Sequence, residues 1–165
     1  MSLAETWQWL EHLRPMSSQV AQSAVQRALL SLLHSVQDSE LSPTTLIWLC
    51  SALEALYDVP PETIGRTLRN RVFLLLGRPA SHKVAARQIA KLYDLRSKFA
   101  HGSFEVVHPL ANDLLDCRVD KLHGALLPIL SLGYALVLST LHHMIRYGWT
   151  AIRFDETLHG ERATP

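Results

Sequence analysis

Apolar residues recur at intervals of three and four along most of the chain, which is the spacing of residues on one face of an α-helix. In residues 3–13 this spacing selects Trp7, Leu10 and Leu13, and residues 18–37 follow with a longer apolar stripe. That stripe consists of Val25, Leu29, Leu32, Leu33 and Val36. Alternation is scarce, and residues 104–108 suit at most an isolated edge strand. The pattern predicts an all-α bundle.

Capping residues place the next two helices. Ser42, followed by a proline, is a suitable N-cap for a helix that extends to about residue 57. Two adjacent prolines separate it from a helix expected over residues 61–76, which Gly77 ends.

Ser81 is the expected N-cap of a fifth helix, which runs to His101 and stops at Gly102. An irregular crossover over residues 103–120 follows, with one helical turn expected near residues 111–116. A long apolar helix over residues 122–145 comes last.

These elements predict a single domain over residues 1–165. Four helices within residues 43–150 form the expected antiparallel core bundle, and two helices within residues 1–40 form an N-terminal addition. Residues 158–165 are expected to fray.

Composition supports a packed protein in a reducing compartment. Apolar residues make up 48% of the 165 residues and charged residues 19%. Cys50 and Cys117 are the only cysteines, and neither has a second ligand at metal spacing. The N-terminus shows no signal-peptide pattern, so a cytoplasmic location is expected.

Charge is nearly balanced, but it is not evenly spread. The net charge of +1 does not by itself favour nucleic acid as a partner. Arg66, Arg69, Arg71 and Arg78 nevertheless fall within one short stretch. Arginine suits bidentate phosphate contacts, although a solvated helix face gives the same pattern.

Residues 122–145 contain no formally charged residue, and this length satisfies the rule for a transmembrane helix. The stretch also contains Gly124, Pro128 and the adjacent His142 and His143, and no cluster of lysines or arginines flanks it. A helix at the centre of a bundle is apolar all round as well. We therefore expect a core helix and no membrane.

The fifth helix has an arginine in its apolar stripe. The stripe consists of Ala85, Ile89, Leu92, Arg96 and Phe99. A buried arginine keeps its charge and needs an anion. The third helix offers Glu54 in a similar stripe, so a Glu54–Arg96 ion pair is expected, and a phosphate from outside is the other compensating group. His101, at the helix end, either caps carbonyl groups or takes part in chemistry.

The segment LYDLRSKFAHG, with LCSALEALY upstream, resembles the Arg-x4-His motif of the HEPN superfamily, and most closely the Apea-like HEPN group. The resemblance covers residues 43–145. It implies a HEPN-like bundle and a metal-independent endoribonuclease that acts as a homodimer with a composite active site. By the same resemblance Arg96 and His101 are the catalytic pair, supported by Glu54 and Ser97. Many active members have Asn, Asp or His where this chain has Ser97.

The residue types suit RNA cleavage. Imidazole exchanges a proton near neutral pH, and guanidinium stabilises charge on phosphate oxygens. Attack by the ribose 2′-OH leaves a 2′,3′-cyclic phosphate and a 5′-OH. The basic row of Lys83, Arg87 and Lys91, together with Lys98, either lines the RNA path or forms a solvated face.

No metal and no cofactor is expected, because no histidine lies in a recognisable ligand pattern. Two alternatives to an autonomous enzyme stay open. One is a non-catalytic HEPN module that dimerises or binds RNA, a nucleotide or a protein. The other is a toxin or defence component that an antitoxin or regulatory protein silences.

Overall fold

The structure is a computed structural model that describes residues 2–13, 19–37, 42–60, 63–108, 110–111 and 116–155. Within these residues the regular elements are all helices, which confirms the all-α prediction, and residues 104–108 form no strand. The predicted frayed tail and most of the predicted turn at 111–116 lie outside the described residues.

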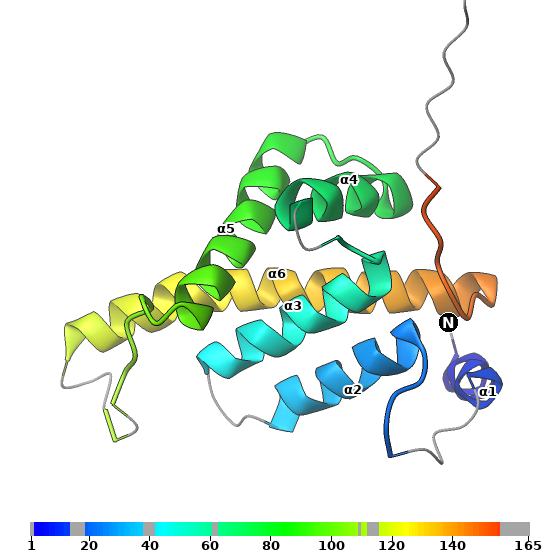
Figure 1. Cartoon of the computed structure of the whole chain (residues 1–165), viewed down its shortest axis with the longest axis horizontal. Helices are drawn as coiled ribbons and strands as arrows, with labels where there is room; N and C mark the ends of the chain where they lie inside the picture. Colours follow the sequence, from blue (N-terminus) through cyan, green and yellow to red (C-terminus); the bar gives the residue numbers. More distant parts are fainter. Residues whose placement is uncertain are drawn as a thin grey trace, which may run out of the picture.

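The helices are α1 (Leu3–His12), α2 (Ala24–Gln37), α3 (Pro43–Tyr57), α4 (Ile64–Leu76), α5 (His82–Ala100) and α6 (Cys117–Tyr147). Figure 1 shows α6 running along the length of the molecule, with α3 crossing it obliquely and α2 lying beside α3. The pair α4 and α5 lies on the other side of α3, and α1 lies at the C-terminal end of α6.

Helix α3 is the centre of the core, because it contacts α2, α4, α5 and α6. Leu46, Leu49 and Leu53 on α3 are completely buried. Gly133 lets α6 approach closely, since a Cβ atom at this position would lie 2.9 Å from Leu49 Cδ1. Packing around one central helix fixes which residues of the outer helices face inward.

Helix α2 belongs to this core, although the sequence predicted that the helix after residue 18 is part of an N-terminal addition to the core bundle. Val25 and Ala28 are buried in the same apolar cluster as the α3 leucines. The predicted α2 stripe is wrong at its C-terminal end, where Leu33 and Val36 are exposed. Ser31 and Ser35 are buried instead. Ser31 Oγ donates to Ser51 Oγ of α3 at 3.3 Å, and Ser35 Oγ donates to the Leu32 carbonyl oxygen of its own helix at 2.7 Å.

The predicted start of α2 at residue 18 is wrong, because α2 begins at Ala24. Ser23 Oγ accepts a hydrogen bond from the Gln26 backbone N–H at 3.2 Å, and Gln26 Oε1 accepts one from the Ser23 N–H at 3.1 Å. This reciprocal pair is a capping box, which satisfies backbone donors at the helix start. The sequence signal for this capping box is the segment SAVQ, residues 23–26.

On α1 the inward residue is Trp9, which the apolar spacing did not select. Trp7 is 65% exposed, whereas Trp9 is buried. The Trp9 indole N–H donates to the Trp149 carbonyl oxygen at 2.8 Å. This bond ties α1 to the chain just after α6, so a contact between the two ends of the sequence determines which tryptophan is buried.

Both ends of α3 are capped. Ser42 Oγ accepts the Thr44 backbone N–H at 3.2 Å, which confirms the predicted N-cap. At the other end Asp58 has a left-handed backbone with φ of 46°. The buried Arg71 of α4 donates to the carbonyl oxygens of Tyr57 and Asp58 and lies over the Phe154 ring. Arg71 is therefore an internal cap, unlike its neighbouring arginines.

Ser81 occupies the predicted N-cap position of α5, but its side chain makes no capping hydrogen bond. Helix α6 begins at Cys117, five residues before its apolar stretch, because the Asp116 carboxylate accepts the Arg118 backbone N–H at 2.9 Å. Pro128 lies inside α6 on an exposed position, where water can reach the carbonyl group that it leaves unbonded.

By length and composition α6 is the one helix in the described chain that is long and apolar enough to cross a membrane. Core helices of soluble proteins pass the same test, and α6 packs against α1, α3, α4 and α5. Val137, Thr140 and Met144 are buried in these contacts. The absence of a membrane span and the cytoplasmic location of the protein stay predictions.

Candidate functional site

The predicted ion pair between α3 and α5 is present. Arg96 Nη2 lies 3.9 Å from Glu54 Oε1, and the two side chains are 36% and 27% exposed. At this distance the pair has Coulomb attraction without a hydrogen bond. Within the described chain Arg96 makes no hydrogen bond, so its guanidinium is oriented while its N–H donors stay unused.

Two further polar side chains join this pair and form a polar cluster of Cys50, Glu54, Tyr93 and Arg96. Glu54 Oε1 and Tyr93 Oη are buried and have no hydrogen-bond partner in the described structure. Buried polar atoms without partners are uncommon in folded proteins. Tyr93 was missed at the sequence level, although its position three residues before Arg96 places it on the same side of α5.

Burial dominates the electrostatics of this polar cluster. It raises the pKa of the Glu54 carboxyl group, and the Arg96 charge opposes this effect only in part. Burial also raises the pKa of the Cys50 thiol to about 12, with a smaller contribution from the Glu54 charge. The Tyr93 pKa is raised for the same reason. Cys50 is thus a protonated core thiol, and Arg96 carries the positive charge.

His101 is placed by the backbone at the end of α5. Gly102, with φ of 71°, gives its N–H to the Phe99 carbonyl oxygen at 3.2 Å, and Ser103 gives its N–H to the Lys98 oxygen at 2.9 Å. These two bonds form a Schellman motif, which satisfies the terminal carbonyl groups. The imidazole of His101 is exposed and makes no hydrogen bond in the described structure. Helix capping therefore does not explain this histidine.

A single chain does not bring Arg96 and His101 together. Five residues at about 100° each place them about 140° apart around the helix axis. Arg96 faces α3, whereas His101 faces solvent, and no contact joins the two described side chains. Ser97 lies four residues before His101, and its carbonyl oxygen accepts the His101 backbone N–H at 3.0 Å. Ser97 thus shares the side of α5 on which His101 lies.

The basic row lies on the outer face of α5. Lys83, Arg87 and Lys91 are exposed, and none of them makes an ion pair within the described chain. Lys98 differs, because its Nζ lies 2.9 Å from Asp94 Oδ2. Lys98 is therefore already neutralised locally, unlike the three residues of the row.

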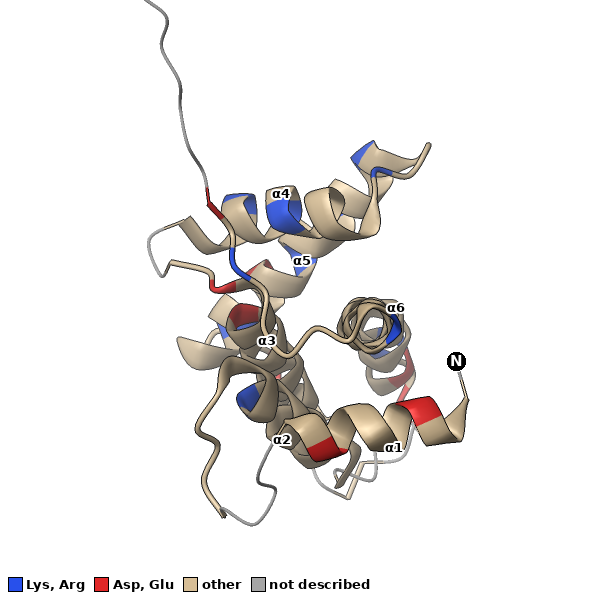
Figure 2. Cartoon of the chain, turned by 90° about the vertical axis from the view of Figure 1, so that its right-hand side faces the viewer, with Lys and Arg blue, Asp and Glu red and all other residues tan. Residues whose placement is uncertain are grey.

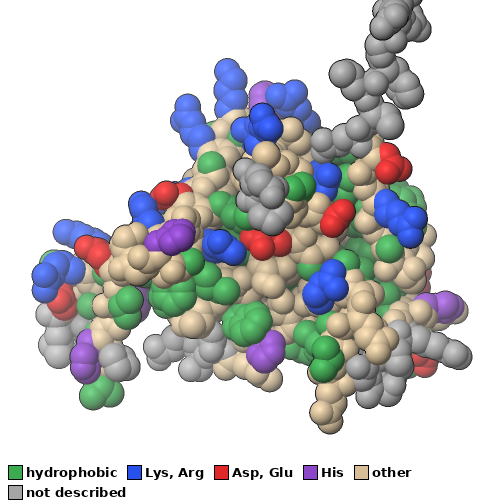
Figure 3. Space-filling model, in the orientation of Figure 1, with side chains coloured by type: hydrophobic (Ala, Val, Ile, Leu, Met, Phe, Trp, Pro, Cys, Tyr) green, Lys and Arg blue, Asp and Glu red, His purple; other side chains and the backbone are tan. Residues whose placement is uncertain are grey.

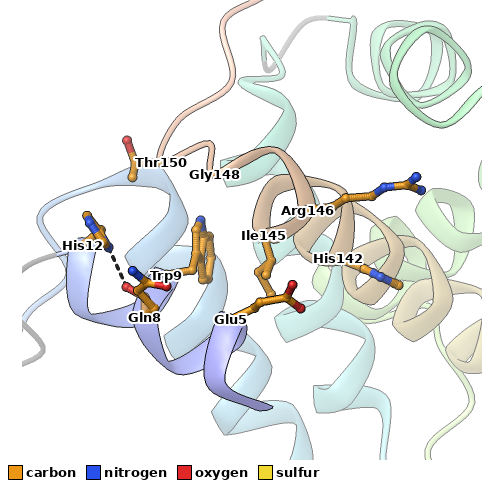
Figure 4. Close-up of a pocket in the computed structure, with 9 residues that line it drawn as sticks. All are labelled: Glu5, Gln8, Trp9, His12, His142, Ile145, Arg146, Gly148 and Thr150. Atoms are coloured by element: carbon orange, nitrogen blue, oxygen red, sulfur yellow. Dashed lines mark hydrogen bonds between the residues drawn. The ribbon is translucent and has the colours of Figure 1, made fainter. Parts of the chain in front are cut away.

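A pocket of about 620 Å³ opens between α1 and the C-terminal end of α6. Its lining is Glu5, Gln8, Trp9, His12, His142, Ile145, Arg146, Gly148 and Thr150. Figure 4 shows Trp9 between the two helices, with His142 and Arg146 directed away from it. The charged side chains do not converge on one point, so the pocket suggests no chemistry. No local sequence pattern indicates this pocket, because its lining comes from the two ends of the described chain.

Among the described residues no three His, Cys, Asp or Glu side chains gather as a metal site requires. Metal independence stays a prediction that needs a chelator experiment.

No family model, no curated protein and no solved structure matches this chain.

Proposed function

We propose that this protein is a metal-independent endoribonuclease of HEPN type. The observation that supports the proposal is how its two motif residues, Arg96 and His101, are placed and hydrogen-bonded. Arg96 is held beside Glu54 with its N–H donors unused, and His101 is fixed at a capped helix end with a free imidazole. Within the described residues neither side chain makes a hydrogen bond, so neither has a structural task there that uses its hydrogen-bonding capacity.

The proposed chemistry assigns one role to each residue. His101 accepts the proton of the ribose 2′-OH or donates a proton to the leaving 5′-oxygen. Arg96 binds the scissile phosphate and stabilises the charge that builds on its oxygens. Glu54 positions Arg96, and Ser97 lies beside His101. The products are a 2′,3′-cyclic phosphate and a 5′-OH.

A homodimer completes the proposed site. Because Arg96 and His101 of one chain point apart, a second copy has to supply the opposing motif. Two copies also provide two histidines, so that one acts as base and the other as acid. Mass measurement in solution tests this requirement, and a strictly monomeric protein that cleaves RNA contradicts it.

The test of the enzyme is incubation of the purified protein with a mixed RNA pool in excess chelator, followed by mapping of the new ends. We expect His101→Ala and Arg96→Ala each to lower cleavage by about 10² to 10⁴-fold. Lys121→Ala, an exposed change on α6, is the matched control and should cleave normally. Equal cleavage by the wild type and His101→Ala rules out the assigned role of His101.

The second candidate function is a non-catalytic HEPN module that binds RNA, a nucleotide or a protein. The separation of Arg96 from His101 favours it, since no complete site exists in one chain. This function predicts a well-folded dimer with no chelator-resistant cleavage. Its Arg96→Ala variant should lose ligand binding, whereas His101→Ala should keep it.

The cellular setting is part of the proposal. A cytoplasmic nuclease of this kind needs restraint, so we place it in a toxin–antitoxin or defence system with an antitoxin or regulatory partner. Growth arrest on induction of the wild type, and its absence with His101→Ala, is the expected result. Equal growth arrest by both proteins contradicts a nuclease toxin.

A further inference from the structure

Charge is segregated along this chain more sharply than its net charge suggests. Residues 63–93 contain seven of the sixteen Lys and Arg residues and none of the fifteen Asp and Glu residues. They form α4, the connecting turn and the first half of α5, which we call the basic hairpin. Figure 2 shows basic positions on α4, and Figure 3 shows Lys and Arg side chains gathered where α4 and α5 join.

Six of these seven cations have side chains that are exposed or, for Arg69, half-buried. Arg71 is the exception, since it is buried and bonds to the end of α3. The others are Arg66, Arg69, Arg78, Lys83, Arg87 and Lys91. None of the six makes an ion pair within the part of the chain that the structure describes.

This arrangement is unfavourable for the isolated protein. Lys83, Arg87 and Lys91 are like charges at four-residue spacing, which destabilises the helix through repulsion between adjacent pairs. The first turn of α5 has no acidic residue to offset the positive end of the helix dipole. A polyanion removes both penalties, so the hairpin is complementary to one.

The geometry of the row favours a nucleic acid backbone over a lipid surface. Successive residues of the row are separated by about 6 Å along the helix axis, which gives a linear array suited to a chain of phosphates. Helices that bind in a membrane interface need a broad face of bulky apolar residues. The large apolar side chains exposed on the basic hairpin are Leu74 and Val84, and no aromatic side chain accompanies them.

The row also points along the helix toward the cleavage motif. Lys83 and His101 are eighteen residues apart, which is about five full turns, so both lie on the same side of α5. The separation along the axis is about 27 Å. Asp94 lies between them, but Lys98 neutralises it at 2.9 Å. An RNA strand can therefore follow the outer face of α5 from the hairpin to His101.

We propose that the basic hairpin is a holding arm for RNA that is separate from the cleavage motif. The arm binds backbone phosphates, while Arg96 and His101 act at the far end of the same helix. A distance of about 27 Å corresponds to roughly eight stacked nucleotides, so productive substrates have at least that length. This inference rests on the proposed function and adds a second binding site and a minimum length to it.

The test measures RNA binding by the full-length His101→Ala protein, which leaves the RNA intact. The arm variant adds Lys83→Gln, Arg87→Gln and Lys91→Gln. Its control adds Arg27→Gln, Lys121→Gln and Arg153→Gln, which remove three exposed cations outside the hairpin. Gln is a good helix former, and loss of like charges should leave the melting temperature of the arm variant unchanged or higher.

We expect an RNA of about sixteen nucleotides to bind the arm variant at least tenfold more weakly than the control at about 50 mM salt. The slope of log affinity against log salt should decrease by about two to three in the arm variant. An RNA of about four nucleotides can occupy the arm but cannot also reach His101, so it should bind the control more weakly than the RNA of about sixteen nucleotides does. Equal weakening by the control means that only total charge matters, which overturns the arm.

Two further outcomes separate this inference from the proposed function. Chelator-resistant cleavage by the wild type that the arm substitutions leave unchanged, on long and short RNA alike, overturns the arm and keeps the nuclease. Arm-dependent RNA binding without cleavage keeps the arm and overturns the nuclease. Arm-dependent binding to phosphatidylserine vesicles, without RNA binding, assigns the basic hairpin to a lipid surface and overturns the RNA arm.

Discussion

The contacts of α3 with α6 and with α5 differ in the hydrogen bonding of their tyrosine hydroxyl groups. Toward α6, Leu49 packs against Gly133, and the Tyr57 and Thr140 hydroxyl oxygens lie 2.6 Å apart in a buried hydrogen bond. Toward α5, Glu54 and Tyr93 keep buried polar atoms without hydrogen bonds beside a half-buried Arg96. A buried hydroxyl pair that is hydrogen-bonded serves stability, whereas unused hydrogen-bonding capacity at an accessible cation suits a ligand.

The largest expected effect lies on the α6 side. Leu49→Ala removes a completely buried side chain and leaves a cavity beside Gly133. We expect a loss of about 2 to 5 kcal/mol in the free energy of unfolding, measured by urea denaturation. Leu74→Ala, at a side chain that is 76% exposed, is the control and should change stability by no more than about 0.5 kcal/mol. A loss below about 1 kcal/mol for Leu49→Ala contradicts close packing at this interface.

A matched pair of tyrosines gives the sharpest comparison of the two sides. Tyr57→Phe breaks the hydrogen bond to Thr140 and should cost about 1 kcal/mol. Tyr93→Phe removes a buried hydroxyl that has no partner in the described structure, so stability should stay level or rise by up to about 1 kcal/mol. Equal losses for the two variants mean that Tyr93 is hydrogen-bonded in solution, and the contrast between the sides then disappears.

The smallest effect is the pH dependence that Glu54 causes. Burial raises its pKa above the ordinary value of 4.5, so the folded protein holds this proton more tightly than the unfolded chain does. The resulting stabilisation is fully present below the ordinary pKa and is lost as pH rises through the raised pKa. The wild type should therefore gain in Tm relative to Glu54→Gln as pH falls from neutrality toward 4.5. A Tm difference that is flat with pH, or that reverses in sign, excludes a raised pKa for Glu54.

Local signals in the sequence predicted the parts of the molecule that depend on near neighbours. Ser42 caps α3, and Gly102 ends α5 through a positive φ that glycine adopts easily. The Glu54–Arg96 pair followed from helical spacing on two helices, because an apolar stripe with one charge in it demands a compensating charge. The start of α2 was also encoded locally, in the reciprocal bonds of Ser23 and Gln26, but the longer apolar stripe obscured it.

Contacts between distant parts of the chain decided the rest. The choice of Trp9 over Trp7 depends on a carbonyl group 140 residues further along the chain. The turning of Arg71 into the core depends on the free carbonyl groups at the end of α3. Spacing could not separate these residues from their neighbours, because periodicity identifies a helix face and not the atoms that it meets.

The sequence by itself determined the helical class, most helix ends and the residue types of the Arg-x4-His motif, since capping and helical spacing act over a few residues. Tertiary structure decided that Arg96 faces Glu54 with its N–H donors unused and that His101 points to solvent. It also decided that the Arg71 side chain is buried in the core, although the other cations of the basic hairpin are not buried. The physical reason is that burial and partner choice depend on which helices meet. That choice is made by the close packing of α3 against its neighbours.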